Sequence, residues 1–205
     1  EYFQITGCEV NDFLLCKVST LLKKEIMKKA YIATYPPRQC GIGTFTQNLF
    51  NSMIASKKDD SDYRNSFIIA MDDPNEKLIY PEEVKLTIRQ ELQEDYLAAA
   101  KHINVSGADC CILQHEFGIF GGQDGIYILP LLHELEIPLI VTLHTVMQAP
   151  SNNQKEVLQT ICGMANRVVV MSYKAIEMLV EIYEIPRSKI AYIEQGVPKI
   201  EYEQE

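Results

Sequence analysis

The sequence predicts an α/β fold: a Rossmann-like parallel sheet flanked by helices on both faces. From residue 27 onward, apolar segments of strand length alternate with segments of helical periodicity. Residues 108–113 are apolar apart from Asp109, a pattern that is typical of a strand buried on both faces of a parallel sheet. This alternation calls for right-handed crossovers between parallel strands.

The expected elements can be placed along the chain from these patterns. Strands are expected at residues 30–34, 67–71, 84–88, 108–113, 138–143, 167–171 and 189–193. Helices are expected after Thr44, at residues 91–103, up to Leu135, at 154–165, and from Ser172, which is placed to cap it, to Tyr183. Residues 114–125 are expected to form a loop.

Length and charge limit the classes of function. The 205 residues fit one domain or one half of a larger enzyme, and 47% hydrophobic residues suffice for a sizeable core. The net charge of -9 argues against a nucleic-acid partner or an anionic membrane surface. No apolar run reaches the ~18 residues that a membrane span needs.

The six cysteines include no Cys-x-x-Cys pair. Cys110 and Cys111 lie in the apolar run, where a buried thiol behaves as a small apolar group. This usage favours a reducing compartment over a disulfide scaffold, so we expect a cytoplasmic protein.

The chain divides into a leader and a domain. Residues 2–4 resemble the end of a cleavable expression tag, and Met27 looks like a native start that leads directly into the first strand. We therefore expect residues 1–26 to be a tag or upstream leader and residues 27–198 to form the domain.

A glycine loop at residues 35–46 follows the first expected strand. We expect Gly41 and Gly43 to make a sharp turn with backbone angles that a side chain forbids. Thr44 and Gln47 have the spacing of a capping box. Backbone N–H groups and the positive end of the helix dipole at this position suit a phosphate or a carboxylate.

Polar residues follow several other strands. Residues 114–122 follow the fourth strand, His144 follows the fifth and Ser172 the sixth. In an open parallel sheet these segments emerge at the carboxyl edge, where such folds bind ligands. The sequence therefore predicts a ligand site at this edge.

Four motifs resemble those of a known family. They are Tyr35-Pro-Pro-Arg-x-Cys-Gly-Ile-Gly-Thr-Phe-Thr46, Gln114-His-Glu-Phe-Gly-Ile-Phe-Gly-Gly122, Thr142-Leu-His-Thr-Val146 and Gly196-Val-Pro198. In this order they look like the amino-terminal half of family 4 glycosyltransferases, with the resemblance covering residues 27–198.

The resemblance implies a GT-B architecture, in which two Rossmann-like halves face each other across a cleft. The amino half holds the acceptor, a carbohydrate or glycolipid, and the carboxy half holds a nucleotide-sugar such as GDP-mannose or UDP-glucose. It also implies a mannosyltransferase-like transfer with retention, without a cofactor or bound metal. Residues 199–205 would then begin the linker to the second half.

The resemblance also assigns roles to residues. The donor diphosphate would lie at Gly41, Gly43 and Thr44, and His144 would be the catalytic residue that touches the transferred sugar near the reacting carbon. Residues on the acceptor and sugar side would be Arg38, His115, Glu116, Gly121, Gly122 and Ser172.

The sequence departs from the family pattern in two places. Glu194 and Gln195 stand where the family often has Pro-His, and the chain ends where a second half with two glutamates eight positions apart should begin. We therefore hypothesise that this chain is an incomplete half, inactive alone.

Three alternatives remain open. The chain could be a non-catalytic sugar- or nucleotide-binding module, or a metal-dependent hydrolase that uses His115, Glu116 and His144. A dinucleotide-dependent oxidoreductase is a weaker alternative, because the third glycine of that motif would fall at Thr46.

Overall fold

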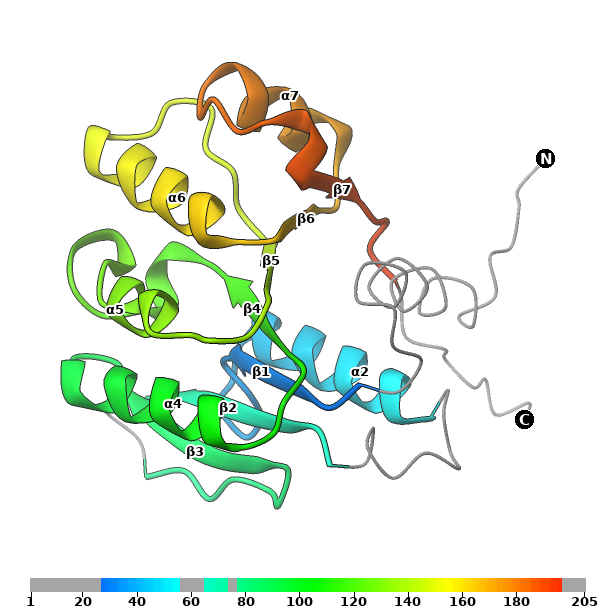
Figure 1. The fold of residues 1–205 in the computed structure, drawn as a ribbon, viewed down its shortest axis with the longest axis vertical. Coiled ribbons are helices and arrows are strands. Elements are labelled where there is room, and N and C mark those ends of the chain that lie inside the picture. Colours follow the sequence, from blue (N-terminus) through cyan, green and yellow to red (C-terminus); the bar gives the residue numbers. More distant parts are fainter. Residues whose placement is uncertain (1–26, 56–64, 74–76, 197–205) are drawn as a thin grey trace, which may run out of the picture.

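The computed structural model describes residues 27–55, 65–73 and 77–196 (Figure 1). Seven strands form one sheet in the order β3-β2-β1-β4-β5-β6-β7, and every neighbouring pair is parallel. The strands are β1 Lys29–Ala33, β2 Phe67–Asp72, β3 Val84–Arg89, β4 Cys110–His115, β5 Leu139–Leu143, β6 Arg167–Val170 and β7 Ile190–Tyr192. The predicted parallel sheet is confirmed.

Helices connect most of these strands. The α-helices are α2 Gly41–Ala55, α4 Gln93–Val105, α5 Ile128–His133, α6 Asn152–Met164 and α7 Tyr173–Glu181. Short 3-10 helices are η1 Phe117–Ile119, η2 Gln123–Gly125 and η3 Arg187–Lys189. Residues 114–125 were expected as loop, but Gln114 and His115 complete β4, and η1 and η2 follow.

The helices lie on both faces of the sheet because the chain reverses its direction across it. The chain moves one way from β1 through α2 to β2, and it returns the other way from β3 through α4 to β4. Right-handed crossovers in opposite directions place α2 on one face and α4 to α7 on the other. Figure 1 shows α4, α5 and α6 stacked in a row beside the sheet.

Two apolar cores follow from this arrangement. Side chains alternate between the faces of each strand, so Tyr31 and Ile112 pack toward α2 with Phe50, while Ile32 and Leu113 join the larger core under the other helices. All five side chains are buried. Both faces of the central strands are thus covered, as their apolar sequences predict.

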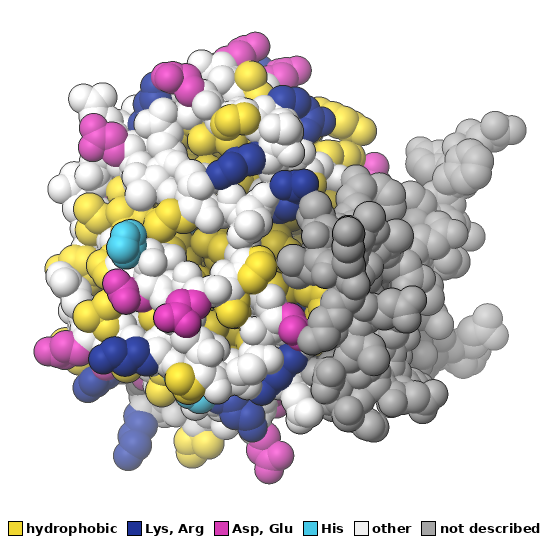
Figure 2. Space-filling view, viewed as in Figure 1, with side chains coloured by type: hydrophobic (Ala, Val, Ile, Leu, Met, Phe, Trp, Pro, Cys, Tyr) yellow, Lys and Arg dark blue, Asp and Glu magenta, His cyan; other side chains and the backbone are white. Residues whose placement is uncertain are grey.

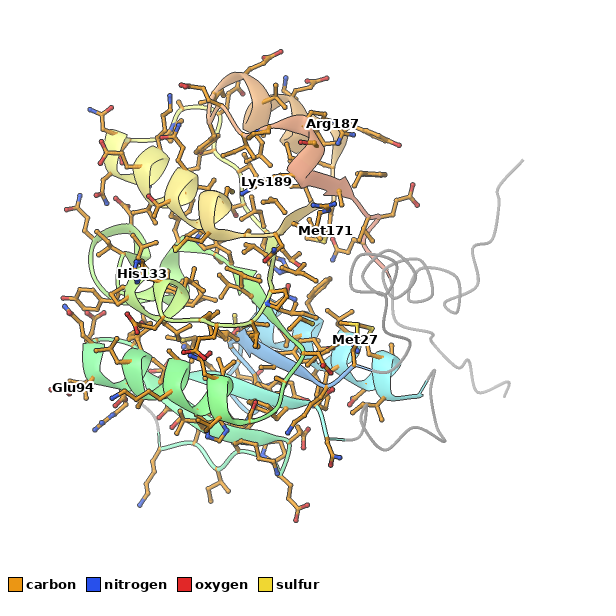
Figure 3. All side chains as sticks on the ribbon, viewed as in Figure 1. Met27, Glu94, His133, Met171, Arg187 and Lys189 are labelled. Atoms are coloured by element: carbon orange, nitrogen blue, oxygen red, sulfur yellow. The ribbon has the colours of Figure 1, made fainter. Side chains whose placement is uncertain are left out.

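Polar side chains fix several helix ends. Ser172 Oγ accepts a hydrogen bond from Ala175 N at 3.1 Å, so the predicted cap of α7 is confirmed. Ser151 and Gln154 form a capping box, which starts α6 at Asn152, two residues earlier than predicted. At the far end of α6, Lys189 Nζ donates to the carbonyl oxygens of Cys162 and Gly163 (Figure 3).

The start of α2 differs from the prediction. Thr44 N donates to Cys40 O at 3.1 Å, so Thr44 lies inside the first turn and the predicted capping box with Gln47 is wrong. Gly41 and Gly43 are also not in the left-handed region that was expected of them. Among the described glycines, Gly107, Gly122 and Gly125 have that conformation.

The surface carries charges of both signs. Figure 2 shows acidic and basic side chains interspersed with apolar ones over the face in view. Among the described residues, no helix combines the length and the apolar character that a membrane crossing requires. The predicted leader at residues 1–26 and the linker at 199–205 lie outside the described residues, as do Val197 and Pro198.

Candidate functional site

The strand order reverses between β1 and β4. β1 pairs with β2 on one side and with β4 on the other, and the chain leaves the two strands toward opposite sides of the sheet. The carboxyl ends of two such strands frame a crevice in which open α/β sheets bind ligands. The loop that leads to α2 and the residues that follow β4 both start here, as predicted from the sequence.

Gly41 and Gly43 lie in the first turn of α2. A Cβ at Gly41 would meet nothing within 4 Å, and one at Gly43 would be 3.4 Å from backbone atoms of Tyr35, which is ordinary contact. Neither position has a positive φ, so neither packing nor backbone conformation requires a glycine. Glycine destabilises a helix by roughly 1 kcal/mol relative to alanine. Its use here is explained if a ligand approaches the backbone closely.

Cys40 directly precedes α2, and the sequence predicted no role for it. Thr34 Oγ1 donates to its Sγ at 3.3 Å. Burial alone would raise the pKa of this thiol, but the hydrogen bonds from Thr34 and from the backbone N–H groups of Gly43 and Ile42 lower it below the usual value. An anion bound at this helix end would therefore share these N–H groups with the sulfur.

Arg38 connects the glycine loop to the end of β2. Its Nη1 donates to Met71 O at 3.0 Å and to Asp72 O at 3.3 Å, and its Nε lies 3.7 Å from Asp73 Oδ2. The guanidinium is mostly buried and makes these contacts within the protein. Its role on the acceptor and sugar side remains a prediction.

His144 follows β5 and contacts two other elements. Its Nε2 lies 2.9 Å from Oε1 of Gln114 on β4, and its ring lies edge-on to Phe45 of α2, with centroids 4.9 Å apart. Burial lowers the pKa of His144 to about 4, so the imidazole is neutral at pH 7. His144 thus brings together the carboxyl ends of β4 and β5 and the first turns of α2.

His115 is fully buried, with 0% of its surface exposed. Its ring is stacked on Phe120, with centroids 5.8 Å apart, and lies edge-on to Phe117 at 5.0 Å. Burial, and secondarily His144, lowers the pKa of His115 to about 3. The predicted contact with an acceptor is therefore not available to this side chain in the structure, because the segment after β4 folds back over it.

Glu116 occupies the cap position of η1. Its carboxylate accepts from Phe117 N at 3.0 Å and from the hydroxyl of Thr145, which follows His144. Glu116 therefore links the segments that follow β4 and β5. It is half-buried, on the same sheet edge as His144.

Gly121 and Gly122 are required by packing. A Cβ at Gly121 would lie 1.9 Å from Gln90 O, and Gly122 has a φ of +72° and faces the ring of Tyr127. Gly121 N also donates to Tyr96 Oη at 2.9 Å. These glycines close the segment onto the end of β3, and their predicted role on the acceptor and sugar side remains a prediction.

Ser172 lies at the same edge, where β6 ends. The next residue, Tyr173, is 67% exposed and stacks on Tyr192 of β7, with ring centroids 4.1 Å apart. This aromatic pair was not predicted from the sequence. The available signal was a tyrosine at or just beyond the ends of two consecutive strands.

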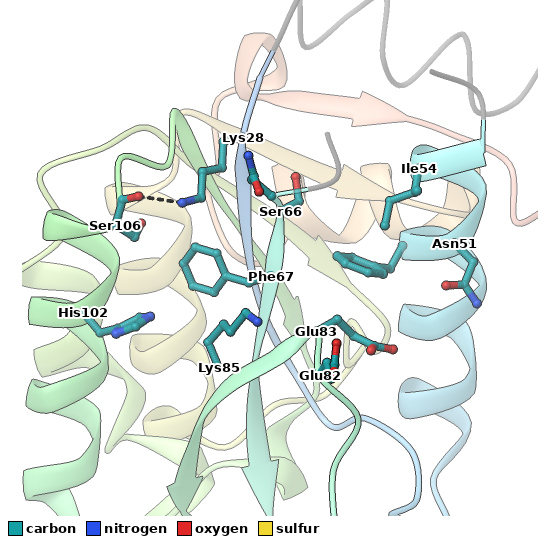
Figure 4. Close-up of a pocket in the computed structure, with 12 residues that line it drawn as sticks. Lys28, Asn51, Ile54, Ser66, Phe67, Glu82, Glu83, Lys85, His102 and Ser106 are labelled. Carbon is teal, nitrogen blue, oxygen red and sulfur yellow. Dashed lines mark hydrogen bonds between the residues drawn. The ribbon is translucent and has the colours of Figure 1, made fainter. Parts of the chain in front are cut away.

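A hollow of about 610 Å³ lies at the opposite, amino edge of the sheet (Figure 4). Lys28, Phe67, Lys85 and His102 line it together with the acidic residues Glu82 and Glu83. Lys28 Nζ donates to Ser106 O at 2.6 Å there. The hollow contains none of the predicted site residues, and its mixed charges select no particular ligand.

The metal-dependent alternative requires ligands that converge. Within residues 27–55, 65–73 and 77–196, no group of three or more His, Cys, Asp or Glu side chains is placed to hold a metal ion. His115 is buried among phenylalanines, and Glu116 is turned toward Thr145. The arrangement of His115, Glu116 and His144 therefore does not favour a metal centre.

The fold and the site define a Rossmann-like α/β protein with its candidate site at the switch point of the sheet. Neither protein-family models nor curated proteins give a match to the chain. Among solved structures, the chain is similar to a glycosyltransferase from Rickettsia africae ESF-5, with a TM-score of 0.55 and 17% identity. The match covers 83% of this chain and 44% of the other, so this chain spans less than half the length of that neighbour. At this identity, the likeness shows the fold.

Proposed function

We propose that the chain is the acceptor-side, amino-terminal half of a retaining, metal-independent GT-B glycosyltransferase of family 4 type. The donor would be a nucleotide-sugar such as GDP-mannose or UDP-glucose, and the acceptor a carbohydrate or glycolipid. The observation that carries this proposal is the meeting of His144, Gln114 and Phe45 of α2 at the carboxyl edge. The structural likeness to a glycosyltransferase supports it at the level of the fold.

In this proposal the amino end of α2 faces the donor diphosphate. The space above Gly41 lets phosphate oxygens reach the helix end. A helix end contributes roughly 0.3–2 kcal/mol toward an anion, whereas micromolar binding needs about 8 kcal/mol. A second Rossmann-like half must therefore supply most of the affinity for the nucleotide-sugar.

His144 would contact the transferred sugar. As a neutral imidazole it can form a hydrogen bond to a sugar hydroxyl without repelling the positive charge that develops at the reacting carbon. Glu116 and Ser172 lie on the same sheet edge and would face the acceptor. His115, Gly121 and Gly122 would act indirectly, because they shape the segment that carries Glu116.

The free thiols fit a reducing compartment. Cys110, Cys111 and Cys162 are buried and unpaired, and burial raises the pKa of each. We propose a cytoplasmic location, a compartment in which nucleotide-sugars are also present.

The test is transfer by a longer protein that carries this chain together with a second Rossmann-like half. We expect release of nucleoside diphosphate from GDP-mannose or UDP-glucose that depends on an added acceptor, with the anomeric configuration of the product retained by NMR. His144→Ala should lower turnover on the order of 10²–10³-fold. The matched control is His133→Ala, because His133 projects from α5 and is 81% exposed (Figure 3).

Two results would contradict the proposal. Near wild-type turnover of the His144→Ala protein would remove His144 from the site. Binding of a sugar or nucleotide without transfer under any donor and acceptor combination would favour the non-catalytic module.

A further inference from the structure

Gln114 and His144 form a pair at the carboxyl ends of β4 and β5. Gln114 is fully buried, and its Oε1 lies 2.9 Å from His144 Nε2. The other amide atom, Gln114 Nε2, is buried without a hydrogen-bond partner in the part of the chain that the structure describes. Among the described residues, this amide therefore makes one side-chain hydrogen bond, and its partner is the candidate catalytic histidine.

The presence of a glutamine here calls for a physical reason. The preceding positions on this strand, Cys110 to Leu113, are apolar and buried, and His115 follows. A buried amide with an unpaired NH₂ group destabilises the fold, and an apolar side chain of similar size would avoid that loss. The hydrogen bond to His144 is the feature that an apolar side chain could not provide.

The imidazole of His144 is held on two sides. The ring of Phe45 packs against it at an interplanar angle of 86°, and Gln114 binds Nε2. Burial keeps the ring neutral at pH 7, so it carries one proton, on either Nε2 or Nδ1. Among the described residues, no hydrogen bond is formed by Nδ1, and this atom is not one of the buried unpaired atoms.

We infer that Gln114 is a positioning residue that holds His144 in the tautomer protonated on Nε2, which leaves Nδ1 as a hydrogen-bond acceptor for a hydroxyl of the sugar. The Nε2–H group donates to Gln114 Oε1. The lone pair on Nδ1 then accepts a hydrogen bond from a hydroxyl group, and Nδ1, which carries no proton, cannot donate one. The role of the sugar hydroxyl rests on the proposed function, whereas the tautomer does not.

This tautomer would discriminate between sugars by the group that faces His144. A sugar with a hydroxyl at the carbon that faces His144 satisfies Nδ1. A deoxy sugar, or one with only an acceptor such as a methoxy group at that position, leaves Nδ1 unpaired in the closed site. Gln114 would thereby select hydroxyl donors without touching the substrate.

The tautomer can be read directly by NMR on this chain. Long-range ¹H–¹⁵N correlation spectra of the protein labelled with ¹⁵N-histidine at pH 7 distinguish the two neutral forms, and His144→Gln identifies which signals belong to His144. We expect His144 in the wild-type chain to be protonated on Nε2. Gln114→Met keeps the length of the side chain and removes Oε1, the hydrogen-bond acceptor for Nε2–H. It should lower the ratio of the Nε2–H to the Nδ1–H form by roughly tenfold.

Two further variants complete the experiment. Gln114→Glu keeps an acceptor at this position and should retain the Nε2–H form with a raised pKa of His144. Gln159→Met is the matched control, because Gln159 Nε2 donates to Tyr183 O at 3.0 Å away from the site, and it should leave His144 unchanged.

The inference is overturned if wild-type His144 is protonated on Nδ1, or if Gln114→Met leaves the tautomer ratio unchanged. The wild-type measurement needs no variant, so a Gln114 variant that fails to fold does not remove the test. The NMR samples contain neither a nucleotide-sugar nor a sugar acceptor. A failure of sugar transfer in the longer protein would therefore count against the proposed function and leave the tautomer result standing.

Discussion

The ring of Phe45 lies edge-on against the ring of His144, with centroids 4.9 Å apart. This contact joins the helix that follows the glycine loop to the end of β5, although the two residues are far apart in the sequence. The apolar periodicity of α2 predicts Phe45 as one of its packing residues, but the pattern does not show that its partner is a polar side chain. The contact is therefore a property of the tertiary structure.

Replacing Phe45 should change the protonation of His144. Burial holds the pKa of His144 near 4, and Phe45 covers part of the ring. In Phe45→Ala, water reaches the imidazole, so the charged form is less disfavoured and the pKa should rise toward 6.5. An NMR titration of the chain labelled with ¹⁵N-histidine measures the pKa of His144 in this variant. Tyr173→Ala, which removes an exposed ring elsewhere on the same edge, should leave this pKa in place.

His115 should be replaceable by phenylalanine with a gain in stability. Both of its ring nitrogens are buried without a partner among the described residues, and the ring already packs between Phe117 and Phe120. An unpaired buried polar group costs roughly 1–3 kcal/mol, so His115→Phe should raise the free energy of unfolding by about 1 kcal/mol. Urea unfolding at pH 7 measures the change, and His133→Phe on the exposed side of α5 should give no gain.

The same variant should reduce the sensitivity to acid. The pKa of His115 is lowered to about 3 in the folded protein, whereas the unfolded chain has a value near 6.5. The unfolded state therefore binds more protons below pH 6.5, and stability falls as the pH drops from 6.5 toward 3. At pH 5 this one group accounts for about 2 kcal/mol. The loss of stability between pH 7 and pH 5 should be smaller by about that amount in His115→Phe. An equal loss in both proteins would contradict the assigned environment of His115.

The fold was largely predictable from sequence because it depends on patterns that many residues share. Each expected strand and helix within the described residues is present, with boundaries displaced by a few residues. The predictions that were wrong are those that depended on the type of a single polar residue. Thr44 has the spacing of a cap yet lies inside α2, and Gln114 and His115 look like loop residues yet complete β4.

The candidate site was predictable in its location but not in its details. A parallel sheet places the carboxyl ends of its strands along one edge, so the positions of His144 and Ser172 follow from the strand assignments alone. The burial of His115 depends on how residues 117–120 fold back, and the pairing of Gln114 with His144 depends on the register between β4 and β5. No local pattern contains that information.

Gly121 provides a test of the segment that follows β4. A Cβ at this position would lie 1.9 Å from Gln90 O and 2.8 Å from the ring of Tyr127. Because backbone atoms must move to relieve the first contact, Gly121→Ala should lower the free energy of unfolding by roughly 2 kcal/mol or more. Gly118→Ala lies in the same segment, where a Cβ meets nothing within 4 Å, and should change stability little. Thermal unfolding of the two variants side by side makes the comparison.

Gly41 separates a structural from a functional use of glycine. Its φ is not positive and a Cβ there would meet nothing within 4 Å, so Gly41→Ala should stabilise the fold by about 0.4–1 kcal/mol. If the donor diphosphate approaches this backbone, the added methyl group should at the same time raise KM for the nucleotide-sugar in the longer protein. Chemical denaturation and steady-state kinetics on the same variant measure the two effects.

Gly163→Ala is the matched control for this experiment. Gly163 lies in the last turn of α6, is exposed, has no positive φ, and a Cβ there also meets nothing within 4 Å. It should therefore stabilise the protein by a similar amount and leave KM unchanged, because it is remote from the carboxyl edge. If both substitutions stabilise the fold and neither affects KM, the space above Gly41 is not used by the donor, and the glycine loop loses its proposed role.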